Sequence, residues 1–323
     1  LRVKDGTRCI ANRAFYENEE LTELILPASV ETIGEEAFAH CKNLKRLHLA
    51  EGLKTIGLSA FAHCSALEAI CIPSSVRSIC QGAFASCASL KQIVVDANNP
   101  RYDSRNNCNA ILHTELKMLV AACPTTVILD VLEIIGDNAF QGVYPFQELV
   151  LPHNVKCIGR SAFGDNPSLQ RVVIPESTEL IGPYAFSHCT ALSDIILPHK
   201  YIEINEDAFS GTACVNSQSP GAAYVGNHLC CYTPYTEDGT EPDCVIPEGI
   251  EYIDAGVFHF APPMRIFFPK SLKGVDICAF IPDESEHELI TPDGIGEDYP
   301  VKNGRIAFQH DINDHWWDIL NNE

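Results

Sequence analysis

The feature that most constrains this chain is an Ala-Phe pair that recurs every 23 residues. The marker Phe keeps this interval in two runs, at Phe15, Phe38, Phe61 and Phe84, and then at Phe140, Phe163, Phe186 and Phe209. The gaps after Phe84 and Phe209 are 56 and 49 residues, that is 23 plus 33 and 23 plus 26, so each gap holds one enlarged repeat. Repetition at such a period predicts a solenoid, because each unit buries its apolar face only against its neighbours.

Each repeat, called a rung below, contains three short motifs. The first is LxxLxLP, whose alternation ended by Pro predicts a short strand with one buried side. The second is VxxIG, which predicts another short extended segment. The third is EEAFAHC (35–41), which predicts a single tight helical turn that points Ala and Phe inward. Clear copies of the first motif occupy residues 21–27, 67–73, 169–175 and 192–198.

Two enlarged rungs, at 90–129 and 213–247, each contain a predicted β-hairpin. In the first, NAILH and KMLVAA flank the turn from His113 to Lys117. In the second, Ala223-Tyr-Val and HLCCY flank the turn Gly226-Asn227. With both included, the LxxLxLP positions number eleven, so we expect about eleven rungs of short parallel strands.

The domain organisation follows from where the repeat ends. Residues 1–282 are expected to form one solenoid, and residues 283–323, which lose the pattern, are expected to form a C-terminal cap. Asn303-Gly304 predicts a hairpin within that cap. A solenoid must cover its last open rung, and apolar bulk for this is supplied by Trp316, Trp317, Ile319 and Leu320. A docking segment for another subunit is the alternative interpretation.

Charge and hydropathy exclude some classes of partner. The chain carries 22 basic and 43 acidic residues, a net charge of −21, which disfavours binding to nucleic acid or to anionic lipid surfaces. No apolar run approaches the ~18 residues of a membrane span, so no membrane insertion is expected. The N-terminal sequence has no signal-peptide pattern. A monomer is favoured, although the sequence leaves the oligomeric state open.

The 15 cysteines are explained mainly by position in the repeat. Cys41, Cys64, Cys87 and Cys189 each lie three residues after a marker Phe, which predicts a buried column of small side chains that donate weak S–H bonds to the backbone. Cys108 and Cys123 lie symmetrically about the turn of the first predicted hairpin, so we expect them to be neighbours. Whether they form a disulfide stays open, because opposed strand Cβ atoms are spaced slightly too widely for one.

No motif for catalysis or for metal or cofactor binding is present. His40-Cys41, His63-Cys64 and His188-Cys189 bring imidazole next to thiol, but adjacent residues on a turn point apart and a catalytic pair has no reason to recur at each repeat. Walker, GxSxG, HExxH and calcium-loop patterns are absent. We therefore expect no catalytic residues, no metal site and no cofactor.

The outward positions of LxxLxLP form two columns that we expect on the concave side of the solenoid. One column is polar and contains Glu23, Arg46, Gln92, Glu148, Arg171, Asp194 and Arg265, with Ala69 as the exception. The other is mainly apolar and contains Ile25, His48, Cys71, Val94, Val127, Val150, Val173, Ile196, Val245 and Phe267. An exposed apolar strip edged by charges typically marks an interaction site, although β-branched residues also simply suit strands. The centre of the candidate face is Val150, Val173 and Ile196, flanked by Glu148, Arg171 and Asp194.

The outward column of VxxIG has a different character. It contains charges of both signs, at Arg8, Glu31, Lys54, Arg77, Glu133, Lys156, Glu179, Glu251 and Lys273, with Ile202 as an exception. Neighbouring rungs are expected to pair these opposite charges. We therefore expect this face to be solvated and not to be the binding surface.

The combined pattern LxxLxLPxxVxxIGxxAFxxC at 23-residue spacing resembles the BspA-like, Treponema-type leucine-rich repeat proteins of bacteria. The resemblance covers residues 7–282, and the insert NPRYDSRNNCNAILHTELKMLVAAC resembles a hairpin insert of that family. It implies a right-handed superhelix or horseshoe of leucine-rich repeats, usually exported or at the cell surface. It also implies binding of other proteins, in some cases adhesion, and no enzymatic activity.

These observations favour a non-enzymatic protein-binding scaffold with an unknown protein ligand. A carbohydrate-binding module is an alternative, which requires exposed aromatic residues and paired carboxylates in a cleft. A structural spacer within a larger surface protein is a third interpretation, favoured if the strand face is uniformly polar.

Overall fold

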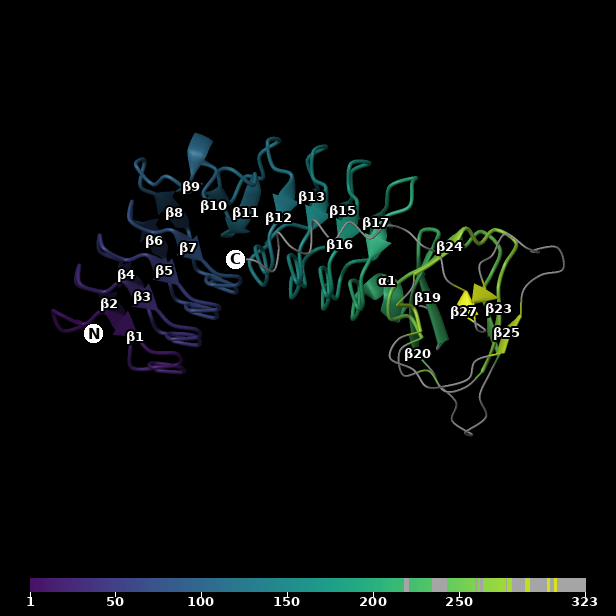
Figure 1. The fold of residues 1–323 in the computed structure, drawn as a ribbon, viewed down its shortest axis with the longest axis horizontal. Coiled ribbons are helices and arrows are strands. Elements are labelled where there is room, and N and C mark those ends of the chain that lie inside the picture. The colour runs from purple at the N-terminus through teal and green to yellow at the C-terminus, as the bar shows by residue number, and fades with distance from the viewer. Residues whose placement is uncertain are drawn as a thin grey trace.

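The computed structural model describes residues 1–217, 221–233, 243–258, 261, 264–276 and 278–280, and the backbone of three further short strands. It confirms the predicted solenoid, with about 11 turns built mostly from parallel strands. Figure 1 shows the rungs stacked side by side along an arc from the N-terminus to the yellow-green strands. Most of the described rungs contribute a long strand from LxxLxLP and a short strand from VxxIG.

The long strands form three separate parallel sheets. They are β2 (Glu23–Ile25), β4 (Arg46–His48), β6 (Ala69–Ile72) and β8 (Gln92–Val95), then β13 (Glu148–Val150), β15 (Arg171–Val173) and β17 (Asp194–Ile196), and then β21 (Cys244–Val245), β23 (Arg265–Phe267) and β25 (Glu288–Ile290). The two interruptions coincide with the two enlarged rungs. The outward side of these strands is called the long-strand face below.

The short strands form a second wall of the solenoid. A first sheet contains β1 (Cys9–Ile10), β3 (Thr32–Ile33), β5 (Thr55–Ile56) and β7 (Ser78–Ile79). A second contains β9 (Tyr102–Asp103), β10 (Ile111–His113), β11 (Met118–Ala121), β12 (Ile134–Ile135), β14 (Cys157–Ile158), β16 (Leu180–Ile181) and β18 (Glu203–Ile204). A third contains β19 (Gly221–Val225), β20 (His228–Thr233), β22 (Tyr252–Ile253) and β24 (Gly274–Val275). Their outward side is the short-strand face.

The tight turn around each marker Phe is formed, but it is not helical as predicted. Glu36 and His40 at the two ends of one such turn have φ of 49° and 61°, which interrupts any helix. The amide of Phe38 instead donates to the carbonyl oxygen of Ala60 in the next rung at 2.8 Å. These turns therefore form their own inter-rung ladder, as strands do. Helix is confined, among the described residues, to α1 (Ala213–Asn216) and the 3-10 turn η1 (Arg105–Asn107).

Neither of these described helices is long enough to span a membrane.

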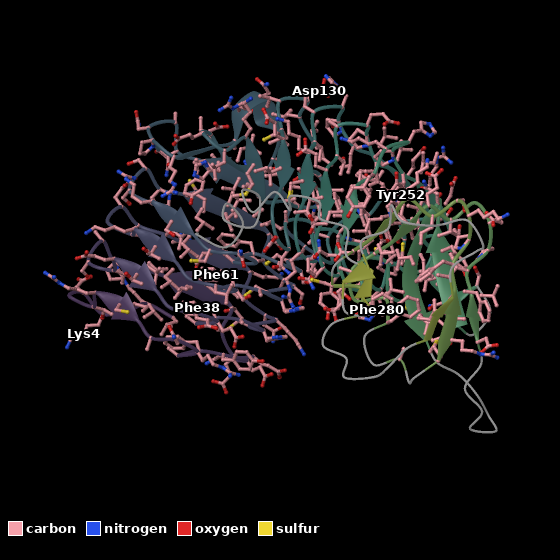
Figure 2. The ribbon with its side chains drawn as sticks, turned by 45° about the vertical axis from the view of Figure 1, so that its right-hand side comes forward. Lys4, Phe38, Phe61, Asp130, Tyr252 and Phe280 are labelled. Atoms are coloured by element: carbon pink, nitrogen blue, oxygen red, sulfur yellow. The ribbon has the colours of Figure 1, made fainter. Side chains whose placement is uncertain are left out.

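The marker Phe side chains form stacks through the core. Ring centroids of successive Phe residues lie 5.0 to 5.5 Å apart with planes within 12° of parallel, in the runs 15–38–61–84, 140–163–186–209 and 258–280. Such stacking is favourable when the rings are offset. Phe38 and Phe61, labelled in Figure 2, lie in neighbouring rungs of the N-terminal half and are fully buried. The rungs are thus joined mainly by apolar contact between equal side chains.

The predicted cysteine column is confirmed. The thiols of Cys41, Cys64, Cys87 and Cys189 are buried and donate to the carbonyl oxygens of Phe15, Phe38, Phe61 and Phe163, over 3.1 to 3.3 Å. Burial raises the pKa of the Cys87 thiol to about 12. These cysteines are therefore inert structural donors, since the thiolate is the reactive form.

The first enlarged rung contains the predicted hairpin, in which β10 pairs antiparallel with β11. The insert also protects the edges of the sheets that end before it. The amides of Ile93 and Val95 in β8 donate to Asn109 Oδ1 at 2.6 Å and Ser104 Oγ at 3.0 Å. Side chains of the insert thus accept the hydrogen bonds that carbonyl groups of a following long strand would otherwise accept.

The hairpin register departs from the symmetry on which the expectation for Cys108 and Cys123 rested. A bulge between Ile111 and Leu112 shifts the pairing by one residue, so the symmetry that would set Cys108 opposite Cys123 ends before it reaches them. Both are buried free thiols.

The second predicted hairpin is also formed, by β19 and β20 around Gly226 and Asn227. Near the C-terminus, β25 pairs parallel with β23, so the long-strand ladder continues past the expected boundary at residue 282. The hairpin predicted at Asn303-Gly304 is formed by β26 (Val301–Lys302) and β27 (Arg305–Ile306). The expected cap residues Trp316, Trp317, Ile319 and Leu320 lie outside the described residues.

Candidate protein-binding face

The central part of the long-strand face is built by β13, β15 and β17. Their parallel register places Glu148, Arg171 and Asp194 in one row across the strands. The same register places Val150, Val173 and Ile196 in a second row. The two rows are two residues apart within each strand, and successive members of one row are 23 residues apart along the chain, so the rows form one continuous surface.

The second row is outside the core, as the sequence predicted. Val150 is 61% exposed and Ile196 is 39% exposed, while Val173 between them is partly buried. Leu149 and Val172, which precede Val150 and Val173 in the strands, are 1% and 0% exposed and pack in the core. The alternation therefore separates core from surface within each strand.

The first row is held together by charge. Arg171 lies between the two acids, with Nε 3.2 Å from Glu148 Oε1 and a second ion pair to Asp194. All three side chains are substantially exposed, so the pairs contribute little to stability. Their effect is to fix a planar guanidinium beside the apolar row, which is an arrangement suited to contact with another protein.

The remaining predicted face residues lie outside this central sheet. Ile25, His48 and Val94 lie on β2, β4 and β8, and Phe267 lies on β23. His48 and Val94 are exposed, and Ile25 and Phe267 are partly buried. Val127 is 57% exposed but belongs to no strand. The apolar column is therefore outward as expected, but it is divided into three parts where the enlarged rungs interrupt the long strands.

Phe146 is an exposed aromatic residue that the sequence interpretation missed. It occupies the first Leu position of its rung, equivalent to the buried Leu169, yet it is 52% exposed. Tyr144 takes the inner place, with its ring against Phe140 and Phe163 and its hydroxyl donating to the Glu148 carbonyl oxygen at 3.0 Å. The only feature of the sequence that indicates this exchange is the presence of two aromatic residues, Tyr144 and Phe146, where other rungs have one Leu.

The short-strand face pairs its charges as predicted. Glu31 contacts both Arg8 and Lys54, with nitrogen–oxygen distances of 3.8 and 2.6 Å. The hydrogen bond from Lys54 holds the pKa of Glu31 below its ordinary value. Glu133 pairs in the same way with Lys156, at 2.9 Å. Ion pairs between neighbouring rungs therefore offset the repulsion that charges stacked in one column would otherwise have.

One buried polar cluster contains an imidazole, a carboxylate and a thiol. His228 Nδ1 lies 2.7 Å from Asp254 Oδ1, and the Cys230 thiol donates to Asp254 Oδ2 at 3.0 Å. Burial raises the pKa of the Cys230 thiol well above its ordinary value, which disfavours a nucleophile. Searched over the described residues, the chain shows no group of three or more ligating side chains placed to hold a metal ion.

The buried carboxyl group of Asp137 is expected to make the stability of the folded chain depend on pH. Burial raises its pKa from 3.8 to about 6, although its Oδ1 accepts from the Arg160 amide at 2.7 Å. Between pH 4 and 6 the folded chain keeps a proton that the unfolded chain releases, so stability falls as pH rises through this window. Asp137→Asn is expected to remove that loss, raising the free energy of unfolding at pH 7 by up to about 3 kcal/mol.

Urea denaturation of both proteins at pH 4, 5, 6 and 7 measures the effect. The two should agree at pH 4 and diverge as pH rises. Asn12, at the equivalent position of the first rung, accepts the Glu35 amide at 3.0 Å, so an Asn fits this bond. A difference that does not change with pH would contradict the assignment.

A family comparison agrees with the repeat pattern. The profile of the BspA type leucine rich repeat region matches residues 7–116 and 122–227, in 6 copies. No curated protein matches the chain.

Solved structures show the same fold. A leucine-rich repeat protein from Eubacterium ventriosum matches with a TM-score of 0.56 at 18% identity, over 94% of this chain and 86% of that chain. The pneumococcal vaccine antigen PcpA matches with a TM-score of 0.62 at 21% identity, over 90% of this chain and 72% of that chain. At these identities the likeness concerns the fold alone.

Proposed function

Because the chain belongs to the BspA type leucine-rich repeat family, we propose that it is a non-enzymatic scaffold that binds another protein through its long-strand face. The observation that carries the proposal is the pair of rows on β13, β15 and β17. There, an exposed apolar row runs beside a charged row that is fixed by Arg171.

The chemistry of this surface fits a protein ligand. Val150 and Ile196 offer apolar area without a partner among the described rungs, and Phe146 adds an exposed aromatic ring next to the same strand. Aromatic and Arg side chains contribute strongly to protein interfaces. The ligand's contact surface is expected to be apolar, with polar groups at its edge that meet Glu148, Arg171 and Asp194.

We propose in addition that the protein is exported or displayed at a cell surface, where it mediates adhesion or another protein contact. Support comes from family resemblance, and one protein with this fold is described as a vaccine antigen. The alternatives are a carbohydrate-binding module and a structural spacer within a larger surface protein. Within the described rungs most Phe rings are buried, which gives the carbohydrate alternative little to stack on.

Val150→Glu and Val173→Glu test the proposed face. Each places a charge in the apolar row and is expected to weaken partner binding by roughly 30-fold or more, the effect of losing a residue central to an interface. Wild-type and variant proteins are immobilised and offered surface and secreted proteins from the protein's own surroundings. Ligands retained by the wild type are then purified and their Kd values measured.

Glu31→Ala and Lys156→Ala on the short-strand face are matched controls that should leave Kd unchanged. Thermal melting separates binding from folding, and Val150→Glu should leave Tm nearly unchanged because the side chain is 61% exposed. Equal loss of binding in the short-strand controls would place the interface elsewhere. If Val150→Glu unfolds the chain, the row is core and the proposal fails.

A further inference from the structure

The apolar row at the centre of the long-strand face repeats at a regular spacing. Its members Val150, Val173 and Ile196 lie in register on β13, β15 and β17, which follow one another along the solenoid in Figure 1. In the same three rungs, the centroids of successive marker Phe rings are 5.3 and 5.5 Å apart. Hydrogen-bonded parallel strands themselves lie about 4.8 Å apart, so the row presents one apolar side chain about every 5 Å along the solenoid axis.

This spacing matches one type of secondary structure in a partner. An α-helix that lies along the row presents a side chain to it once per turn, about every 5.4 Å. Side chains on one face of a β-strand are about 6.6–6.8 Å apart. Over the two intervals of the row a helix therefore falls out of step by about 1 Å, and a strand by about 3 Å or more. Only the helix keeps an apolar side chain over each of the three rungs.

Main-chain hydrogen bonding favours the same structure. β15 pairs with β13 on one side and with β17 on the other, so its backbone groups are used within the sheet. An extended segment lying on this face would gain no main-chain hydrogen bonds from the sheet, and its own amides would lose water over the apolar row at a cost in free energy. A helix bonds its backbone groups internally and presents only side chains.

We propose that the protein ligand docks an amphipathic α-helix along the row of Val150, Val173 and Ile196, with the helix axis parallel to the axis of the solenoid. The proposal rests on the proposed function, and it specifies which part of the ligand meets the long-strand face. The contacting residues of the helix are apolar and recur about once per turn, in the pattern i, i+3 or i+4, and i+7.

The charges around the row favour basic residues at the border of this helix. On the strands, Arg171 pairs with both Glu148 and Asp194, which leaves one negative charge in excess. In the loops that follow the strands, exposed Glu176 and Lys200 balance each other. The whole chain has a net charge of −21, so a helix flanked by Lys or Arg is attracted and an acidic helix is repelled. Because these groups are exposed, they affect selection of the partner and its rate of association more than its affinity.

Two synthetic peptides of identical composition test the proposal. Each has about 18 residues of Ala and Lys, enough for an isolated helix to form in part, and carries three Leu and a fluorescent label. One peptide has Leu at i, i+4 and i+7, the period of a helix, and the other has Leu at i, i+2 and i+4, the period of a strand. Fluorescence anisotropy with the wild-type protein measures Kd for both. The helical-period peptide is expected to bind roughly tenfold or more tightly than its isomer, with a gain in helical circular dichroism on binding.

Variants of the protein locate the peptide. Val150→Glu should weaken binding of the helical-period peptide by roughly tenfold or more, because it places a charge in the apolar row. Glu31→Ala on the short-strand face should leave this Kd unchanged. Replacing Lys by Glu in the peptide should weaken binding, and the loss should shrink as salt is added.

Three results would overturn the proposal. They are equal or tighter binding of the strand-period isomer, unchanged binding of the helical-period peptide to Val150→Glu, and no binding of that peptide up to about 1 mM. None of these results decides the proposed function, which fails on a separate observation, namely that proteins retained by the wild type are retained equally by Val150→Glu.

Discussion

Replacing Phe61 with Ala is expected to lower the free energy of unfolding by about 3–5 kcal/mol, because the deleted ring leaves a cavity between two rungs. Phe61 is fully buried, and its ring stacks on Phe38 at 5.3 Å and on Phe84 at 5.5 Å. Each stack also contributes beyond the buried area. Urea denaturation followed by circular dichroism measures the effect.

Phe15 provides the matched control. It is only partly buried and stacks on one neighbour, Phe38, at 5.1 Å. Phe15→Ala is therefore expected to destabilise clearly less than Phe61→Ala. Equal losses would show that stacking between rungs does not determine the contribution of these residues.

Replacing Asn166 with Ala is expected to destabilise by roughly 3 kcal/mol, because it removes a buried side chain whose four hydrogen bonds include one to an otherwise orphaned amide. Its Nδ2 donates to the carbonyl oxygens of Phe140 at 3.0 Å, Phe163 at 2.7 Å and Gly164 at 3.2 Å. Its Oδ1 accepts from the Tyr144 amide at 2.7 Å. The side chain is 1% exposed, so water does not replace these bonds.

Asn166→Cys separates the two directions of hydrogen bonding. Cys occupies the equivalent slot in other rungs, as Cys189 does, and donates one bond to the preceding rung. It does not supply the acceptor for Tyr144, so the loss should lie between those of wild type and Asn166→Ala. A larger loss for Cys than for Ala would contradict the assigned roles, and urea denaturation again decides.

The sequence by itself determined the features that depend on the repeat. A solenoid brings each residue beside its equivalent 23 residues away, so a column in the alignment is also a column in space. The Phe stacks, the cysteine donors, the charge pairs of the short-strand face and the outward position of Val150 all follow from that rule. Both hairpins were visible because their turns separate short apolar runs.

Only the tertiary structure decided what departs from the repeat. In the turns around the marker Phe, backbone amides donate hydrogen bonds to carbonyl oxygens of the next rung. These bonds override the helical turn that the local sequence alone favours. Tyr144 packs against the rings of Phe140 and Phe163, while Phe146 is left exposed. The division of the long-strand face likewise depends on where the insert ends the sheets. In each case the local structure depends on which side chains or backbone groups pack together in three dimensions. A periodic sequence pattern does not contain that information.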